Sequence, residues 1–68
     1  MPYNLSTEFF KNEGNKEFYM NNFEKAILYY TRGTQLNCED KELIAKLFCN
    51  IGTAYFYLGE TFVLDSVY

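Results

Sequence analysis

The sequence predicts an all-α fold of antiparallel helical hairpins, with three helices and a short or frayed fourth helix. Three observations favour this class. Apolar residues recur every three to four positions in three separate segments, each segment follows a residue that commonly caps helices, and the connections between the segments are short. Short connections place consecutive helices antiparallel and leave no room for strands or a crossover.

The first predicted helix begins at a cap formed by Ser6 or Thr7 and ends at the polar break of residues 20–22. Its apolar stripe consists of Phe9, Phe10, Gly14 and Phe18. The second predicted helix has Asn22 as its N-cap and continues to about Leu36. The stripe of this helix consists of Phe23, Ala26, Ile27, Tyr30 and Gly33. Both stripes have the spacing of a helix that packs one face against a neighbour.

The third predicted helix begins after Asp40, its expected cap, and ends near Gly59. It has the most regular pattern in the chain, made by Leu43, Ile44, Leu47, Phe48, Ile51, Ala54, Tyr55 and Leu58. Residues 60–68 could start a fourth helix, but nine residues are too few for an isolated stable helix. We expect four aromatic residues in the core, with the lining of a groove as the alternative for some of them: Phe18, Tyr30, Phe48 and Tyr55. Three others are candidates for an exposed apolar surface: Tyr29, Tyr57 and Phe62.

The composition limits the classes of function. A chain of 68 residues allows one domain, and with 49% apolar and 21% aromatic residues it is too hydrophobic for intrinsic disorder. The net charge is −3, and the six basic residues are dispersed, so no basic stripe exists to follow a phosphate backbone. Nucleic acid is therefore not an expected partner.

Catalysis, cofactors, metals and membranes are not expected either. The sequence has no His, no Gly-rich phosphate loop, and no Ser or Cys with a base at a suitable spacing. Its two thiols, Cys38 and Cys49, cannot complete a zinc site alone. No apolar run approaches the roughly 20 residues that cross a bilayer, and the first residues do not have the features of a secretory signal. We expect a cytosolic location, with the nucleus as an alternative, where both thiols stay reduced.

Three stretches carry a more specific pattern: residues 11–16, residues 22–30 and residues 50–59. They resemble the tetratricopeptide repeat family, and within it the co-chaperone subgroup. Gly14 and Ala26 stand where the family has small residues that allow two helices to pack closely. The family's aromatic positions are matched by Phe10, Tyr30 and Tyr55. A glycine inside a helix costs about 0.5–1 kcal/mol relative to alanine, and close helix packing would offset that cost.

The resemblance implies a single truncated repeat domain over residues 1–68. Repeat one covers about residues 7–40, and a partial repeat two covers about residues 45–68. Asn12 and Asn50 are then equivalent and lie 38 residues apart, against a usual period of about 34, so the connection is longer than usual. The match weakens after Gly59, where Thr61 and Leu64 depart from the family pattern.

The resemblance also implies a protein–protein interaction module and no enzyme. Co-chaperones of this subgroup bind the C-terminal Glu-Glu-Val-Asp peptide of heat-shock protein 90 or 70 through a dicarboxylate clamp. Three clamp positions match: Lys11, Asn15 and Asn50. Lys11 and Asn15 are four residues apart and share one helix face, and Lys46 is an accessory candidate beside Asn50. Two further basic residues of the family's clamp are not matched, so we expect weak binding by a partial clamp.

Other interpretations remain open. The polar residues Lys11 and Asn15 also suit an ordinary solvated helix face, and Lys46 is more simply a surface lysine. The alternative function is a structural or self-associating repeat fragment with no chaperone-tail binding, in which a second copy covers the incomplete repeat. A third is a degenerate product without a stable fold. The choice of partner, and whether the partial clamp binds measurably, are left open by the sequence.

Overall fold

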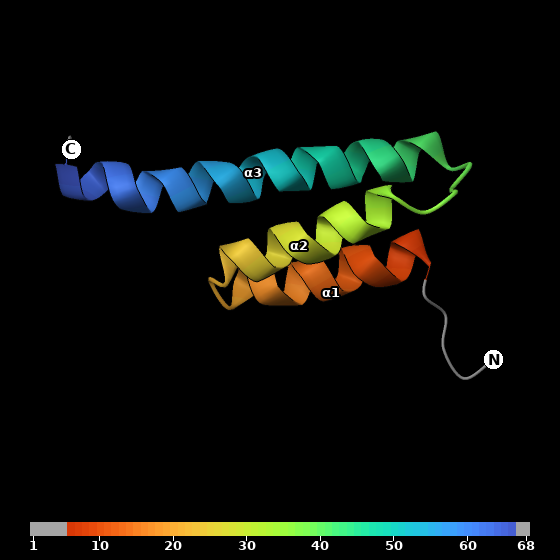
Figure 1. The fold of residues 1–68 in the computed structure, drawn as a ribbon, viewed down its shortest axis with the longest axis horizontal. Coiled ribbons are helices and arrows are strands. Elements are labelled where there is room, and N and C mark those ends of the chain that lie inside the picture. Colours follow the sequence, from red (N-terminus) through yellow and green to blue (C-terminus); the bar gives the residue numbers. More distant parts are fainter. Residues whose placement is uncertain (1–5, 67–68) are drawn as a thin grey trace.

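The computed structural model describes the backbone of residues 6–66 and the side chains of residues 6–59. It contains α1 (Thr7–Tyr19), α2 (Phe23–Thr34) and α3 (Lys41–Ser66). All three are helices, which confirms the predicted all-α class within the described residues. The helices α1 and α2 form an antiparallel hairpin, and α3 runs back along α2 (Figure 1).

Side-chain caps begin α1 and α3 where the sequence predicts them. The Phe9 N–H donates to the Ser6 hydroxyl at 3.1 Å, and the Leu43 N–H donates to the Asp40 carboxylate at 3.1 Å. Asn22 occupies the N-cap position of α2, but its side chain does not cap the helix. Its amide instead donates to the Glu17 carboxylate at 3.0 Å, across the turn.

The reversal between α1 and α2 depends on Asn21, which has a positive φ of 65°. Its N–H donates to the Phe18 carbonyl at 3.0 Å, and the next N–H, of Asn22, donates to the Glu17 carbonyl at 2.8 Å. This pair of bonds satisfies two carbonyls at the end of α1 and turns the chain sharply. Asparagine is one of the few residues other than glycine that accept this conformation. The turn holds α2 against α1.

The core lies where α2 meets its two neighbours. Ala26, Tyr30 and Leu47 are buried there. Gly14 has a clear role in this packing, because a Cβ atom at that position would overlap the ring of Tyr30. At the other end of the hairpin, the Thr7 hydroxyl donates to the Gly33 carbonyl at 3.0 Å in a buried bond. The two helices of the hairpin are therefore held together both at Gly14 and at the start of α1.

The predicted end of the third helix is wrong. We expected it near Gly59, but α3 continues to Ser66, so residues 60–66 extend α3 instead of starting a separate fourth helix. A glycine ends a helix most readily by taking a positive φ, and no glycine among the described residues does so. Residues 67–68 and the side chains of Thr61, Phe62 and Leu64 lie outside the described part.

Two of the four aromatic residues predicted for the core are exposed. Phe48 and Tyr55 have exposed fractions of 59% and 57%, so this prediction is wrong for them. Both lie on the face of α3 that has no packing partner among the described residues. Tyr30 is buried and Phe18 is half-buried against the core, as predicted. Tyr57 is exposed, also as predicted.

Candidate peptide-binding site

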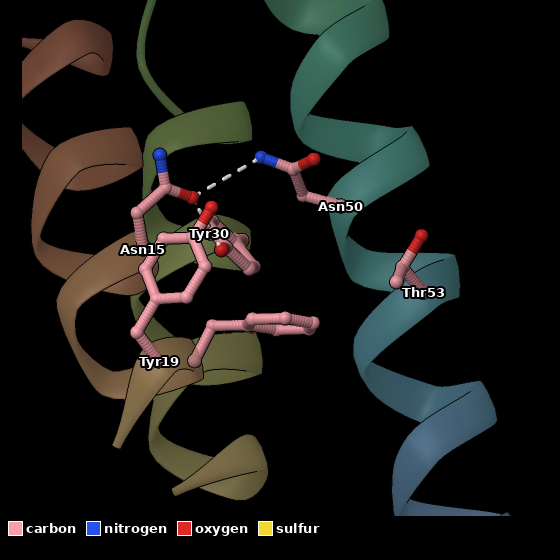
Figure 2. A pocket seen from close by; sticks show the side chains of 6 residues that line it. Asn15, Tyr19, Tyr30, Asn50 and Thr53 are labelled. Atoms are coloured by element: carbon pink, nitrogen blue, oxygen red, sulfur yellow. Dashed lines mark hydrogen bonds between the residues drawn. The ribbon is translucent and has the colours of Figure 1, made fainter. Parts of the chain in front are cut away.

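A pocket of about 150 Å³ opens between α1 and α3, with α2 beneath it. All three helices contribute to its lining, which consists of Asn15, Phe18, Tyr19, Tyr30, Asn50 and Thr53. Two of the predicted clamp residues, Asn15 and Asn50, are therefore brought to the same place, although 35 residues separate them in the sequence. Figure 2 shows their amide groups turned toward one another across the pocket.

Asn15 is held by two hydrogen bonds that converge on its Oδ1 atom. The Tyr30 hydroxyl donates to it at 2.6 Å, and the Asn50 Nδ2 group donates to it at 3.4 Å. The Nδ2 atom of Asn15 points away from Tyr30 in Figure 2. An amide carries two donor hydrogens and one acceptor oxygen. With the acceptor of Asn15 already occupied, its Nδ2 hydrogens are the groups of this amide that are left for a ligand, and they suit an acceptor such as a carboxylate.

Tyr30, on α2, fixes the orientation of the Asn15 side-chain amide. Its side chain is buried, and this burial, with a smaller contribution from Tyr19, raises the pKa of Tyr30 above its ordinary value. The hydroxyl therefore stays protonated at neutral pH and remains a hydrogen-bond donor. Because the short bond takes the oxygen of Asn15, the nitrogen of the same amide must face the other way. Tyr30 thus belongs to both the core and the pocket.

Lys11 lies one turn before Asn15 on α1, on the same face. It is not among the residues that line the pocket, and its ammonium group pairs with the Glu8 carboxylate at 3.1 Å. The lysine side chain is 21% exposed and that of Glu8 57% exposed. The pair is therefore partly exposed, and ion pairs at the protein surface contribute only about 0–1 kcal/mol, so a ligand carboxylate can compete for the lysine.

Lys46, the predicted accessory residue, is exposed on α3 one turn before Asn50. It does not line the pocket. Of the four predicted site residues, the structure therefore brings together the two asparagines, places Lys11 one turn away in an ion pair, and leaves Lys46 on the surface.

Sequence reasoning did not identify Tyr19 and Thr53 as pocket residues. Tyr19 follows Asn15 by four positions, and Thr53 follows Asn50 by three, so each shares a helix face with a predicted site residue. This spacing was the available signal. The sequence places Tyr30 in the core, with the groove lining as the alternative for some of the core aromatics, and gives no role to its hydroxyl, although the hydroxyl of a buried tyrosine usually finds a polar partner.

The chemistry of the pocket favours binding over reaction. Its polar groups are two amides and two kinds of hydroxyl, and its remaining surface is aromatic. Among the described residues, no group of three or more His, Cys, Asp or Glu side chains could hold a metal ion. The same part of the chain contains no helix long and apolar enough to cross a membrane.

Comparison with known proteins gives one consistent similarity. The chain is 40% identical over 51 residues to tetratricopeptide repeat protein 4 from Homo sapiens, and it has the same identity to the proteins of that name from Bos taurus and Mus musculus. The match covers 75% of this chain, which spans only 13% of the length of these relatives. No family model matches the chain, and no solved structure matches it significantly.

The similarity in sequence agrees with the architecture. Paired antiparallel helices, a close α1–α2 contact at Gly14, and a third helix laid along the second are the arrangement that the repeat pattern predicts. Together they support a protein-interaction module. Over three quarters of its length this chain resembles tetratricopeptide repeat protein 4, and it has the helical-hairpin fold expected of a tetratricopeptide-type repeat.

Proposed function

We propose that this chain is a co-chaperone-like interaction module that binds the free C-terminal carboxylate of an acidic peptide. The peptide class is the Glu-Glu-Val-Asp ending of heat-shock proteins 90 and 70. The observation that carries the proposal is the meeting of Asn15 and Asn50 in one pocket, where Tyr30 orients the Asn15 amide and Asn50 donates to the same oxygen. Similarity to tetratricopeptide repeat protein 4 supports the same assignment.

A terminal carboxylate matches the available groups. One of its oxygens can accept from Asn15 Nδ2, and the other can accept from the second hydrogen of Asn50 Nδ2. A second carboxylate in the peptide can take Lys11 from Glu8, because the existing pair is partly exposed to solvent on the Glu8 side. Neutral amides suit this task, since they donate to an anion without adding a charge that must be desolvated.

The aromatic part of the pocket gives the apolar side chain of the peptide a place to rest. Phe18 is half-buried, and Tyr19, whose ring packs edge-on against it, is 82% exposed, so both rings offer apolar surface to a bound side chain. With one lysine and two amides the module has few charge-assisted contacts. We expect a dissociation constant on the order of 0.1–1 mM.

The test is an amide NMR titration with a peptide that ends in Glu-Glu-Val-Asp, run beside the same peptide with an amidated C-terminus. The free-acid form should shift the resonances of Asn15, Asn50 and Lys11, and the amidated form should shift them at least tenfold less at equal concentration. Equal shifts from both peptides would contradict the proposal that the pocket binds the terminal carboxylate.

A matched pair of variants separates the pocket from general charge effects. Asn50→Ala removes one donor from the pocket and should weaken binding by about fivefold to tenfold. Asn12→Ala removes the same side chain from an exposed position on α1 and should leave binding unchanged. If both variants bind alike, the peptide contacts another surface.

We also propose a cytosolic location, where the exposed Cys49 thiol would stay reduced.

A further inference from the structure

The outward face of α3 carries a second apolar stripe that the peptide pocket does not use. Phe48, Tyr55 and Phe56 are exposed by 59%, 57% and 62%. Between them lie the exposed Cys49 and Gly52, at helical spacings of three and four residues. Large apolar side chains this exposed, gathered on one helix face, usually mark an interaction surface.

The stripe is nearly symmetric about Gly52. Phe48 and Phe56 stand four residues before and after the glycine, and Cys49 and Tyr55 stand three before and after it. A two-fold axis requires that residue i of one copy meets residue j of the other, and that j meets i. An antiparallel pair of α3 helices centred on Gly52 fulfils this condition, because each Phe48 then faces Phe56 of the other copy.

Gly52 has the open backbone that such a pairing needs. A Cβ atom built on Gly52 would meet nothing within 4 Å, whereas one on Gly14 would overlap the Tyr30 ring. In the described fold, Gly14 and Gly33 lie where another element packs closely, while Gly52 and Gly59 face open space. Gly52 offers the same opening 38 residues later, at the centre of the exposed stripe.

The charges on this face do not oppose pairing. Residues 47–59 contain no charged side chain, so two copies of the stripe bring no like charges into contact. The net charge of −3 on each chain acts only at longer range, where salt screens it. Pairing should therefore become slightly tighter as salt is added.

The available area fits a weak dimer. An aromatic side chain offers roughly 150–250 Å² for burial, so three rings exposed by about 60% supply about 270–450 Å² per copy. The total of about 540–900 Å² from both copies lies below the roughly 1,200–2,000 Å² of stable interfaces. This comparison predicts a dissociation constant on the order of 100 µM.

We propose that the outward face of α3 binds a second copy of this chain, as an antiparallel helix pair centred on Gly52. The interface is separate from the peptide pocket. Asn50 precedes Gly52 by two residues, which places the two side-chain directions about 160° apart around the helix. A dimer can therefore form while both peptide pockets stay open.

Sedimentation velocity of the 68-residue chain tests the proposal, at concentrations from about 10 µM to about 1 mM. The mass should rise from 8.1 kDa toward twice that value. Phe56→Glu, on the exposed stripe, should keep the chain monomeric over the whole range with its helical circular dichroism unchanged. Lys46→Glu, on another exposed face of α3, should still dimerise. A constant monomer mass in the native chain would overturn the proposal, as would a dimer that survives Phe56→Glu.

Disulfide formation tests the antiparallel register. In a background with Cys38→Ser, one variant keeps Cys49 alone, and another keeps Cys49 and carries Tyr55→Cys. In this register position 49 of one copy faces position 55 of the other, while two thiols at position 49 lie about 9 Å apart along the helices, too far for a strain-free bond. Oxidation should cross-link the Tyr55→Cys variant at least tenfold faster. Equal or faster cross-linking of the variant with Cys49 alone would exclude this register.

Discussion

The two faces of α3 have similar hydrophobicity and opposite environments. On the inward face, Leu47 and Ala54 are fully buried. On the outward face, Phe48 and Phe56 are more than half exposed, although Phe48 is the immediate neighbour of Leu47. The difference is that α2 covers the first face and no described element covers the second. Apolar periodicity therefore marks surfaces that can be buried, without saying which partner buries them.

The largest expected effect is a contrast between these two neighbours. Leu47→Ala should destabilise the fold by about 2–5 kcal/mol, because it leaves a cavity in the core, and a chain this small could lose its cooperative melt altogether. Phe48→Ala should change stability by no more than about 0.5 kcal/mol. Urea denaturation at low protein concentration measures both. Equal losses would mean that the outward face is packed within one copy.

Substitutions at two glycines test the same contrast between a packed and an open helix face. Gly14→Ala should destabilise the fold by about 1–3 kcal/mol, because the added methyl group overlaps the Tyr30 ring. Gly52→Ala should stabilise the monomer by about 0.5–1 kcal/mol, since alanine is the better helix former and open space surrounds this position. Thermal melts of dilute samples compare them. A gain in stability from both substitutions would contradict the close α1–α2 packing.

Tyr30 links the core to the pocket, and its removal should have an intermediate effect. Tyr30→Phe should cost about 0.5–1.5 kcal/mol near neutral pH, because the Asn15 oxygen loses its short hydrogen bond. Tyr19→Phe is the matched control, and it should cost little because Tyr19 is 82% exposed.

The raised pKa of Tyr30 predicts that the stability of the fold depends on pH, and Tyr30→Phe tests this dependence. The pKa of Tyr30 is higher in the folded chain than in the unfolded one. Its contribution to stability is therefore complete below about pH 10, the value for an unfolded tyrosine, and is lost as pH rises through the folded pKa. Denaturation measured from pH 8 to 11.5, in about half-unit steps, should show a steeper alkaline decline for the native chain than for Tyr30→Phe. Parallel curves would exclude a buried, protonated Tyr30 hydroxyl.

The smallest expected effect concerns Lys11. Glu8→Gln frees this lysine from its ion pair and should tighten peptide binding about twofold to threefold. Glu13→Gln is an equal change in charge on α1, since Glu13 pairs with Lys16 at 3.0 Å. If Glu13→Gln tightens binding as much, the gain is a general charge effect and Lys11 has no specific part in it.

Much of the fold could be predicted from the sequence, because its determinants are local. The caps at Ser6 and Asp40 are single side chains beside an apolar stripe, and the structure uses both. The end of α3 could not be predicted, since a glycine such as Gly59 ends a helix only if tertiary contacts or a positive φ favour it. The exposure of Phe48 depends on the lack of a covering element among the described residues, which no local pattern records.

In the candidate site, too, local features could be predicted from the sequence and tertiary contacts could not. Helical spacing placed Lys11 and Asn15 on one face, but it could not tell that Glu8 already holds the lysine. The approach of Asn50 to Asn15 depends on how α3 lies along α2, and only the resemblance to a known family indicated it. The role of Tyr30 needed the structure, because a stripe residue looks the same whether or not its hydroxyl reaches a partner.

The side-chain amide resonances of Asn15 and Asn50 provide the most direct test of the central claim, that these two amides read a carboxylate. Their N–H₂ signals can be followed in ¹⁵N-edited spectra while the free-acid peptide is added. The account predicts that both pairs of signals move downfield together and saturate with one dissociation constant, as each amide donates to the bound anion. Backbone shifts elsewhere, with both N–H₂ pairs unmoved at saturation, would contradict it.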